Sequence, residues 1–175
     1  YTCPLAKIIA SFNVKYHLYA DDTQIWLRMD SSTDSVVIVE QCLESILQWM
    51  TANKLKLNPS KTNIIIHAAK PLANCPITLH LNGIAIVPVK TARNLGINFD
   101  SCLSFKEHVS SVCKSCYFWL RQIRSISRVL PSDCIKYLVI SLVISRLDFC
   151  NSVLTNISGK LLSRLQRVQN SAARL

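Results

Sequence analysis

The sequence is poor in glycine and in acidic residues, and it has no long apolar run. Only three of its 175 residues are glycine and half are hydrophobic, which argues against a disordered chain. The longest apolar run, from Tyr137 to Ile144, contains Ser141 and falls well short of the ~20 residues that a membrane-spanning helix needs. No targeting signal is recognisable either. These absences predict an intracellular protein, of the nucleus or the cytoplasm, with no membrane partner.

Basic residues outnumber acidic ones by twenty to ten, and the excess is concentrated in the second half of the chain. Residues 104–175 hold eleven Lys and Arg against three Asp and Glu, whereas residues 1–103 hold nine against seven. A basic half of this kind is typical of a surface that binds a polyanion, and nucleic acid is the first candidate. The alternative is charge that only keeps helix surfaces solvated.

Eight cysteines are spread over the chain, and most lie within apolar helical patterns. Only Cys113 and Cys116 form a C-x-x-C pair, and a zinc site would need a second pair or His partners at matching spacing. Because no signal peptide precedes them, we expect reduced and buried thiols in place of disulfides.

Hydrophobic periodicity predicts an α+β arrangement in which strands and helices are followed by helices alone. Apolar residues spaced i, i+3, i+4, i+7 from Val36 to Met50 indicate an amphipathic helix, and Asn82-Gly83 between two alternating runs indicates a hairpin. The remaining elements of the first part are expected at residues 4–11 (helix), 14–27 (strand, turn, strand), 62–67 (strand) and 94–100 (strand).

From Phe105 onward the hydrophobic period is helical. The second of the expected helices has apolar residues around most of its circumference, so we expect it to be largely buried. The predicted boundary between the two parts lies near residue 103. The three helices are expected over about 105–123, over 131–154 and from 161 onward.

Two adjacent carboxylates, Asp21 and Asp22, lie at the expected turn of the first hairpin. Like charges this close raise each other's pKa, and a divalent cation removes that penalty. Mg²⁺ prefers one or two carboxylates together with phosphate oxygens, and two-metal phosphoryl-transfer sites share carboxylates in this way. The alternative is a solvated Asp-Asp turn without a ligand.

The tetrad Tyr19-Ala20-Asp21-Asp22, with apolar strands on both sides, resembles the catalytic hairpin of reverse transcriptases. Further segments are similar, in the same order, to parts of non-LTR (LINE-type) retrotransposon enzymes. The resemblance therefore implies a partial polymerase palm over residues 1–103 and an all-α thumb-like region over residues 104–175. The similar segments are 47–66 (helix, turn and lysine-bearing strand of the palm), 89–100 (strand before the thumb), and 105–126, 130–154 and 160–175 (thumb-like helices).

The resemblance also implies roles for individual residues. Asp21 and Asp22 would hold the catalytic Mg²⁺ ions, with Mn²⁺ as a substitute, and Asp21 would be the direct ligand. Lys61, after the Asn58-Pro59-Ser60 turn, matches the lysine near the incoming triphosphate, where it would neutralise or protonate the leaving group. A solvated lysine at a strand end is the alternative for Lys61.

Other positions would contact the nucleic acid. Tyr19 and Ala20 would lie near the primer end, and Leu95 and Gly96 match a strand that supports the primer terminus, although a simple packing role for that pair is an alternative. Basic residues on the first C-terminal helix would follow phosphates without reading bases. These residues are Lys106, Lys114, Arg121, Arg124 and Arg128.

In this family the site also takes an aspartate from an earlier palm strand, and the twenty residues before Asp21 contain no acidic residue. We therefore expect a fragment of an RNA-directed DNA polymerase that does not polymerise alone. The complete enzyme would use an RNA template, a DNA primer and deoxynucleoside triphosphates. A non-catalytic, nucleic-acid-binding remnant of a decayed transposon reading frame is the alternative. The sequence does not indicate an oligomeric state.

Overall fold

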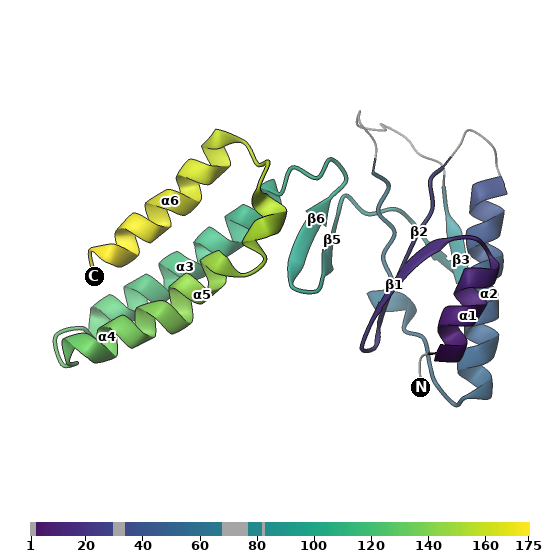
Figure 1. Cartoon of the computed structure of the whole chain (residues 1–175), viewed down its shortest axis with the longest axis horizontal. Coiled ribbons are helices and arrows are strands. Elements are labelled where there is room, and N and C mark those ends of the chain that lie inside the picture. The colour runs from purple at the N-terminus through teal and green to yellow at the C-terminus, as the bar shows by residue number, and fades with distance from the viewer. Residues whose placement is uncertain (1–2, 30–33, 68–76, 82) are drawn as a thin grey trace. The chain divides into compact units, whose positions relative to one another are not determined.

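The computed structural model describes residues 3–29, 34–67, 77–81 and 83–175, which form helices and antiparallel hairpins (Figure 1). The predicted α+β class is confirmed. The chain divides into two compact units, the first comprising residues 1–64 and 73–89, and the second residues 65–72 and 90–175. The division into palm and thumb-like parts at residue 103 stays a prediction. Within the described ranges, no helix is both long and apolar enough to cross a lipid bilayer.

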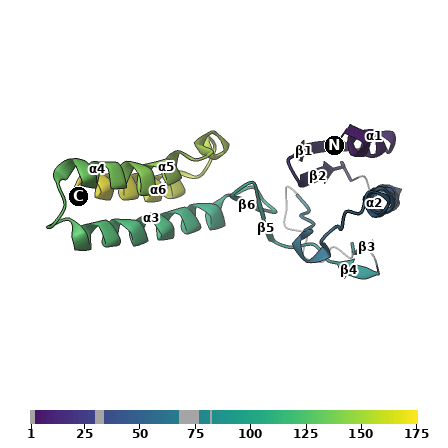
Figure 2. The ribbon, with the colours of Figure 1, turned by 90° about the horizontal axis from the view of Figure 1, so that it is seen from below.

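In the first unit, two helices and a hairpin enclose a small core. The elements are α1 (Cys3–Ser11), β1 (Lys15–Tyr19), β2 (Asp22–Trp26) and α2 (Asp34–Ala52), and Figure 2 shows α1 alongside β1. The β1–β2 hairpin lays alternate side chains against the core, so the predicted strand, turn and strand of residues 14–27 are confirmed. The buried residues of this core are Leu5, Ile9, Val14, Cys42 and Ile46.

A second hairpin of this unit joins β3 (Leu79–Leu81) to β4 (Ile84–Ile86), as predicted. Gly83 has a φ of +75°, as the predicted turn requires, and Asn82 lies outside the described residues. Glu40 of α2 holds β3 in place, because its Oε1 accepts a hydrogen bond from the His80 N–H at 3.2 Å.

The strand predicted for residues 62–67 is wrong. Only Ile64 is paired, in an isolated parallel bridge with Pro88, and the Val89 N–H donates to the Ile64 carbonyl at 2.8 Å. Pro88 has no N–H to donate, which limits further pairing. β-Branched composition indicated a strand here, but the described residues supply no partner strand along this segment.

The second unit begins with a hairpin where one short strand was predicted for residues 94–100. β5 (Thr91–Asn94) pairs with β6 (Ile97–Asp100), and the turn is Leu95-Gly96. Both turn residues have positive φ, +45° and +86°, which is the sign pattern of a type I′ turn. Leucine is not a turn-forming residue, so the first half of this hairpin was missed.

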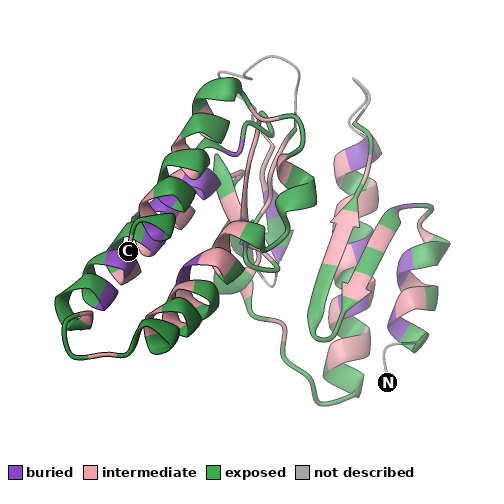
Figure 3. Cartoon of the chain, turned by 60° about the vertical axis from the view of Figure 1, so that its left-hand side comes forward, coloured by how far each residue is buried: buried purple, intermediate pink, exposed green. Residues whose placement is uncertain are grey.

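Helices make up the rest of the second unit. α3 and α6, predicted from periodicity, pack together through buried residues that Figure 3 shows in purple on their facing sides. The buried cluster between these helices contains Val109, Cys113, Cys116, Leu120, Ile123, Val143, Val168 and Ala172. The elements are α3 (Lys106–Ile126), α4 (Ser132–Val139), the π-helical turn η2 (Ile140–Ile144), α5 (Ser145–Asp148), the 3-10 turn η3 (Asn151–Leu154) and α6 (Gly159–Ala173).

The helix predicted for residues 131–154 differs in two ways. It contains the π-helical turn η2, and it ends at Asp148, two residues before Cys150 with its φ of +53°. It is also not largely buried, because only the side that faces α3 is covered. Val143 is buried there, whereas Tyr137 and Ile140 on the other side are 72% and 57% exposed.

The expectation of buried thiols holds only in part. Cys42, Cys113 and Cys116 are buried, and burial raises the pKa of Cys116 to about 11. The other described cysteines are exposed, and Cys75 lies outside the described residues. Those exposed residues, for which the expectation is wrong, are Cys3, Cys102, Cys134 and Cys150.

Candidate functional site

The tip of the β1–β2 hairpin is a two-residue turn, Ala20-Asp21, closed by the pairing of Tyr19 with Asp22. Ala20 has a φ of +52°, and Asp21 does not have a positive φ. This is the sign pattern of a type II′ turn, whose first central residue is usually glycine. A positive φ at a residue with a Cβ costs roughly 1–2 kcal/mol. The turn is therefore a strained position that the surrounding hairpin holds.

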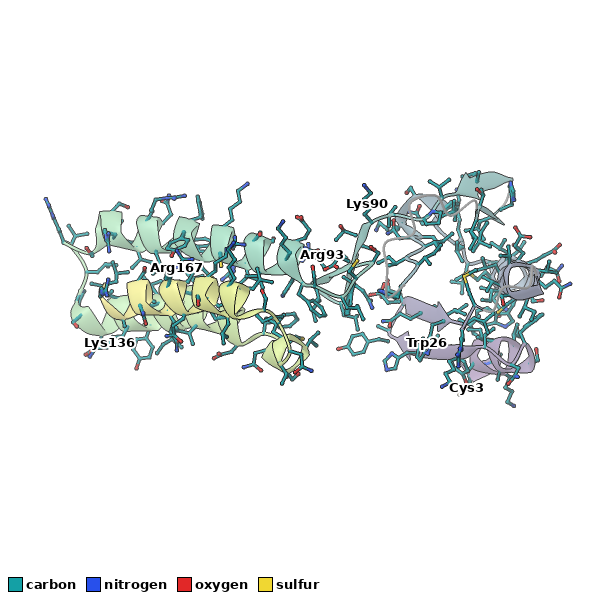
Figure 4. All side chains as sticks on the ribbon, turned by 90° about the horizontal axis from the view of Figure 1, so that it is seen from above. Cys3, Trp26, Lys90, Arg93, Lys136 and Arg167 are labelled. Carbon is teal, nitrogen blue, oxygen red and sulfur yellow. The ribbon has the colours of Figure 1, made fainter. Side chains whose placement is uncertain are left out.

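The two faces of this hairpin have different surroundings. Tyr16, Leu18 and Ile25 lie on one face and pack against the core of the first unit. Because side chains alternate along a strand, Tyr19 and Asp22 share the other face. That face is open. Tyr19 is 59% exposed, and Trp26, at the far end of β2 and labelled in Figure 4, is 49% exposed.

Asp21 and Asp22 are both exposed at the tip. Neither carboxylate has a hydrogen bond or an ion pair with another side chain among the described residues. Hard carboxylate oxygens without protein partners fit a Mg²⁺ or Mn²⁺ ion in their donor chemistry. In the described part of the chain, no group of three or more His, Cys, Asp and Glu side chains could hold a metal. The pair therefore offers two of the ligands that such an ion takes.

Lys61 lies at the end of a short 3-10 turn, η1 (Pro59–Lys61), and its side chain is exposed. Asn58 caps this turn, because its Oδ1 accepts hydrogen bonds from the Ser60 N–H at 3.1 Å and from the Ser60 hydroxyl at 2.6 Å. The predicted Asn-Pro-Ser turn is confirmed. No contact among the described residues joins Lys61 to the two aspartates, so its role near a triphosphate stays a prediction.

Leu95 and Gly96, the predicted primer-supporting pair, form the turn of the β5–β6 hairpin in the second unit. Leu95 is 38% exposed. Gly96 lies against Phe149 at the end of α5, where an added Cβ would be 3.0 Å from the ring carbon Cε1. One residue of the pair thus packs internally, and the other is partly open to solvent.

Two contacts that sequence reasoning missed join this hairpin to α3. The Asp100 carboxylate accepts hydrogen bonds from the N–H groups of Ser104 at 2.9 Å and Phe105 at 2.7 Å, at the start of the helix. Burial raises the pKa of Asp100, but these hydrogen bonds outweigh it and the net pKa is lowered. Buried His108 accepts a hydrogen bond at Nδ1 from the Asn98 N–H at 3.4 Å, and burial lowers its pKa. An acidic residue shortly before a helix was the signal that could have identified the first contact.

The basic residues predicted to follow phosphates are all exposed. Four lie within α3, and Arg128 follows its last residue by two positions. The spacing of the four residues within α3 places them on one side of the helix, next to its buried stripe. Of the neighbouring aromatic residues, Trp119 packs against the core with Arg146 at 5.6 Å from its ring centroid, whereas Tyr117 and Phe118 are exposed.

A second basic row, on α6, was not predicted. Its spacing of i, i+4, i+7 and i+14 puts its members on one side of a helix that carries no acidic residue. Arg164 Nη1 donates to the Ser110 hydroxyl of α3 at 3.1 Å. Burial raises the pKa of Cys113, and the charges of Arg164 and Arg167 oppose that change. The row consists of Lys160, Arg164, Arg167 and Arg174.

Comparisons with known proteins support the family that the sequence of the β1–β2 hairpin indicates. A family model described as reverse transcriptase (RNA-dependent DNA polymerase) matches residues 2–138. Over 106 residues the chain is 26% identical to a Drosophila melanogaster protein described as a probable RNA-directed DNA polymerase from transposon BS. That stretch is 61% of this chain and 12% of the relative's length. No solved structure matches the chain. The family inferred from the Tyr19–Asp22 tetrad is confirmed: the chain belongs to the reverse transcriptase family of RNA-dependent DNA polymerases.

Proposed function

We propose that this chain carries the catalytic hairpin of a retrotransposon RNA-directed DNA polymerase of the non-LTR (LINE) type. Residues 1–103 would belong to its palm and residues 104–175 to its thumb-like region. The observation that carries the proposal is the tip of the β1–β2 hairpin, where a strained two-residue turn presents two exposed carboxylates without described partners.

The residues of the tip have distinct roles in this proposal. Asp21 and Asp22 bind divalent cations, and Mg²⁺ or Mn²⁺, when bound, neutralises phosphate charge during nucleotidyl transfer. The fixed φ of Ala20 sets the direction of the Asp21 carboxylate, and its small side chain leaves room for a primer end beside Tyr19. The Lys61 ammonium group attracts the triphosphate of the incoming nucleotide. The substrates are a DNA primer on an RNA template and deoxynucleoside triphosphates.

Paramagnetic broadening by Mn²⁺ tests the metal site in the full 175-residue chain. With ¹⁵N-labelled protein, the amide signals around the hairpin tip are expected to lose intensity first as Mn²⁺ is added. The double variant Asp21→Asn/Asp22→Asn removes both charges with little change of shape, and the selective loss disappears. Asp133→Asn is the matched control, because it removes an exposed carboxylate that already pairs with Lys136 at 3.1 Å. Equal broadening of the tip in the double Asn variant would overturn the proposed metal site.

A second function, metal-independent nucleic-acid binding, is favoured by the basic rows on α3 and α6. Cations on exposed helix faces follow phosphates whatever the base sequence. This function predicts salt-sensitive binding of a primer–template duplex in EDTA that the double Asn variant retains. If binding requires both Mg²⁺ and the two aspartates, the helical part does not act by itself.

A further inference from the structure

A cleft of about 560 Å³ lies in the second unit, between the β5–β6 hairpin, α3 and the segment formed by η2 and α5. Its volume falls in the range of sites that take a small organic molecule, roughly 300–1,000 Å³. The hairpin contributes Arg93 and Asn98, which are paired across the two strands and therefore present their side chains on the same face. Figure 4 labels Arg93 at the end of this unit where the hairpin adjoins α3.

The cleft is lined by two guanidinium groups, those of Arg93 and Arg146, and its described lining contains no Asp or Glu. Neither arginine forms a salt bridge with a described residue. Arg146 is held in position, because its Nη1 donates to the Leu142 carbonyl at 2.6 Å and its guanidinium carbon lies 5.6 Å from the centroid of the Trp119 ring. A guanidinium group has five N–H donors, so both arginines keep donors for a ligand.

Buried His108 supplies a further donor to the cleft. The side chain is only 5% exposed, and its Nδ1 accepts the hydrogen bond from the Asn98 N–H, so the neutral imidazole carries its proton on Nε2. Nε2 has no hydrogen-bond partner among the described residues. No described polar side-chain atom that is shielded from solvent lacks a partner, so Nε2 is accessible at the cleft that His108 lines. A buried N–H without a partner indicates a place for an acceptor.

An apolar wall lies beside these donors. It is formed by the ring of Phe149, which follows α5, and by Val112 of α3, with Gly96 against the ring. Ser111 and Ser115 add hydroxyl groups on the α3 side. The cleft therefore combines a flat hydrophobic surface with cations and hydrogen-bond donors, which is the usual composition of a small-molecule site.

We propose that this cleft binds a small organic dicarboxylate with a planar apolar body, with Arg93, Arg146 and His108 donating to the carboxylates and Phe149 contacting the body. The fork of N–H groups on a guanidinium matches a planar carboxylate, and two such forks without a competing acid fit two carboxylates. The apolar wall favours an organic anion over inorganic phosphate, which has no apolar surface to bury. The site does not involve the hairpin tip, and the inference does not depend on the proposed function.

The ligand also acts on the docking of the β5–β6 hairpin. Arg93 belongs to the hairpin, His108 to α3 and Arg146 to α5, so an anion that contacts all three residues binds only while the three elements are packed together. A ligand that binds one arrangement stabilises it. Occupation of the cleft is therefore expected to slow hydrogen exchange of the Asn98 amide, which donates to His108.

NMR titration of the ¹⁵N-labelled 175-residue chain tests the proposal with isophthalate as the probe. Isophthalate has two carboxylates on one aromatic ring, and isophthalamide is the matched neutral probe with the same shape. The amide signals of Gly96 and Asn98 are expected to shift saturably with isophthalate, with a dissociation constant on the order of 1 mM for so small a ligand. Isophthalamide should bind about tenfold more weakly or not at all, because it lacks the charges that pair with the guanidinium groups.

Substitutions of the lining residues separate this site from general attraction by a basic protein. Arg93→Gln and Arg146→Gln should each weaken isophthalate binding about five- to tenfold. Arg28→Gln is the matched control, because it removes the same charge from an exposed position in the first unit and should leave binding unchanged. Arg146→Lys keeps the charge but loses the fork, so it should also bind more weakly than wild type.

A variant that fills the cleft keeps the test decisive where loss of Arg146 disturbs its packing on Trp119. Ser111→Leu places a larger apolar side chain at the cleft, and leucine favours a helix more than serine does. It is expected to abolish the isophthalate shifts at Asn98 while the circular dichroism spectrum and the urea midpoint are retained.

Four results would overturn the inference. Gly96 and Asn98 could show no saturable shift with isophthalate, or isophthalamide could bind equally well. The Arg93→Gln variant, or the Ser111→Leu variant, could bind isophthalate as Arg28→Gln does. Finally, inorganic phosphate could displace isophthalate at a lower concentration than isophthalate itself requires, which would identify a phosphate ligand in place of a carboxylate. None of these results affects the Mn²⁺ test at the hairpin tip, so failure of this inference and failure of the proposed function are distinguishable.

Discussion

A Cβ atom added to Gly96 would lie 3.0 Å from Cε1 of Phe149, so the turn of the β5–β6 hairpin is in direct contact with the ring at the end of α5. The contact fixes the turn that was predicted to support a primer terminus. It also couples two segments that are more than fifty residues apart in the chain, which a local sequence pattern does not reveal.

Gly96→Ala is expected to destabilise the hairpin by more than its backbone strain alone. Alanine at a φ of +86° costs about 1–2 kcal/mol, and the clash with Phe149 adds to that cost. Gly83→Ala is the matched control, because its φ is +75° and an added Cβ meets no atom within 4 Å. Hydrogen exchange of the β5–β6 amides measures the loss in Gly96→Ala, and exchange of the β3–β4 amides measures the loss in Gly83→Ala. In a double-mutant cycle, Phe149→Ala should restore part of the loss, and full additivity would contradict the contact.

Ala20→Val should destabilise the β1–β2 hairpin by about 1–3 kcal/mol, because a β-branched residue is strongly disfavoured at the φ of +52° found there. Ala85→Val, at an exposed position of β4 without a positive φ, should be close to neutral. Amide exchange at Tyr19 and Asp22, the pair that closes the turn, reports the difference. Equal protection in the two variants would mean that the turn is not strained.

Asp100→Asn should cost about 0.5–1.5 kcal/mol in the second unit, because the amide nitrogen cannot accept the hydrogen bond that the Phe105 N–H donates to Oδ2. The folded-state pKa of Asp100 is lowered, so its stabilising contribution is fully present above the unfolded pKa of about 3.9 and is lost as pH falls through the folded pKa. Urea unfolding over a pH series should show a difference between wild type and variant that is full at pH 7 and shrinks as the pH is lowered below about 3.9. A difference that stays constant throughout the acid series would contradict this assignment.

His108 should make the docking of the hairpin sensitive to mild acid. Its Nδ1 must be unprotonated to accept the Asn98 hydrogen bond, and burial lowers its pKa below the usual 6.5 or so. The unfolded chain therefore binds the proton more readily, and stability falls as pH drops below about 6.5. His108→Gln keeps an acceptor but removes the titration, so exchange of the Asn98 amide should depend less on pH between 7 and 5. His17→Gln, at an exposed position, should leave the wild-type dependence unchanged.

Cysteine alkylation should separate the thiols by burial. Burial raises the pKa of Cys116 to about 11, and its Sγ lies 3.8 Å from the Val143 carbonyl oxygen. Iodoacetamide at pH 8 should label Cys134 and Cys150 rapidly and Cys116 only after unfolding, as peptide mass spectrometry can follow. Rapid labelling of Cys116 in native conditions would contradict the packing of α3 against η2.

The sequence by itself determined the family and the elements whose signals are local. The Tyr19–Asp22 turn, the helix from Val36 to Met50 and the buried stripe of α3 all follow from periodicity and turn chemistry within a few residues. The tertiary structure decided what depends on distant partners. Residues 62–67 have β-branched composition but lack a partner strand among the described residues, and Leu95 adopts a positive φ in a turn packed against Phe149.

The basic rows of α3 and α6 also depend in part on local sequence and in part on tertiary packing. Helical spacing determined that the cations of α3 lie on one side, because that depends only on 3.6 residues per turn. That α6 places Arg164 on Ser110, fifty-four residues away, depends on how the two helices pack through Val168 and Ala172. Packing of buried side chains, which no local pattern encodes, therefore brought the second basic row beside the first.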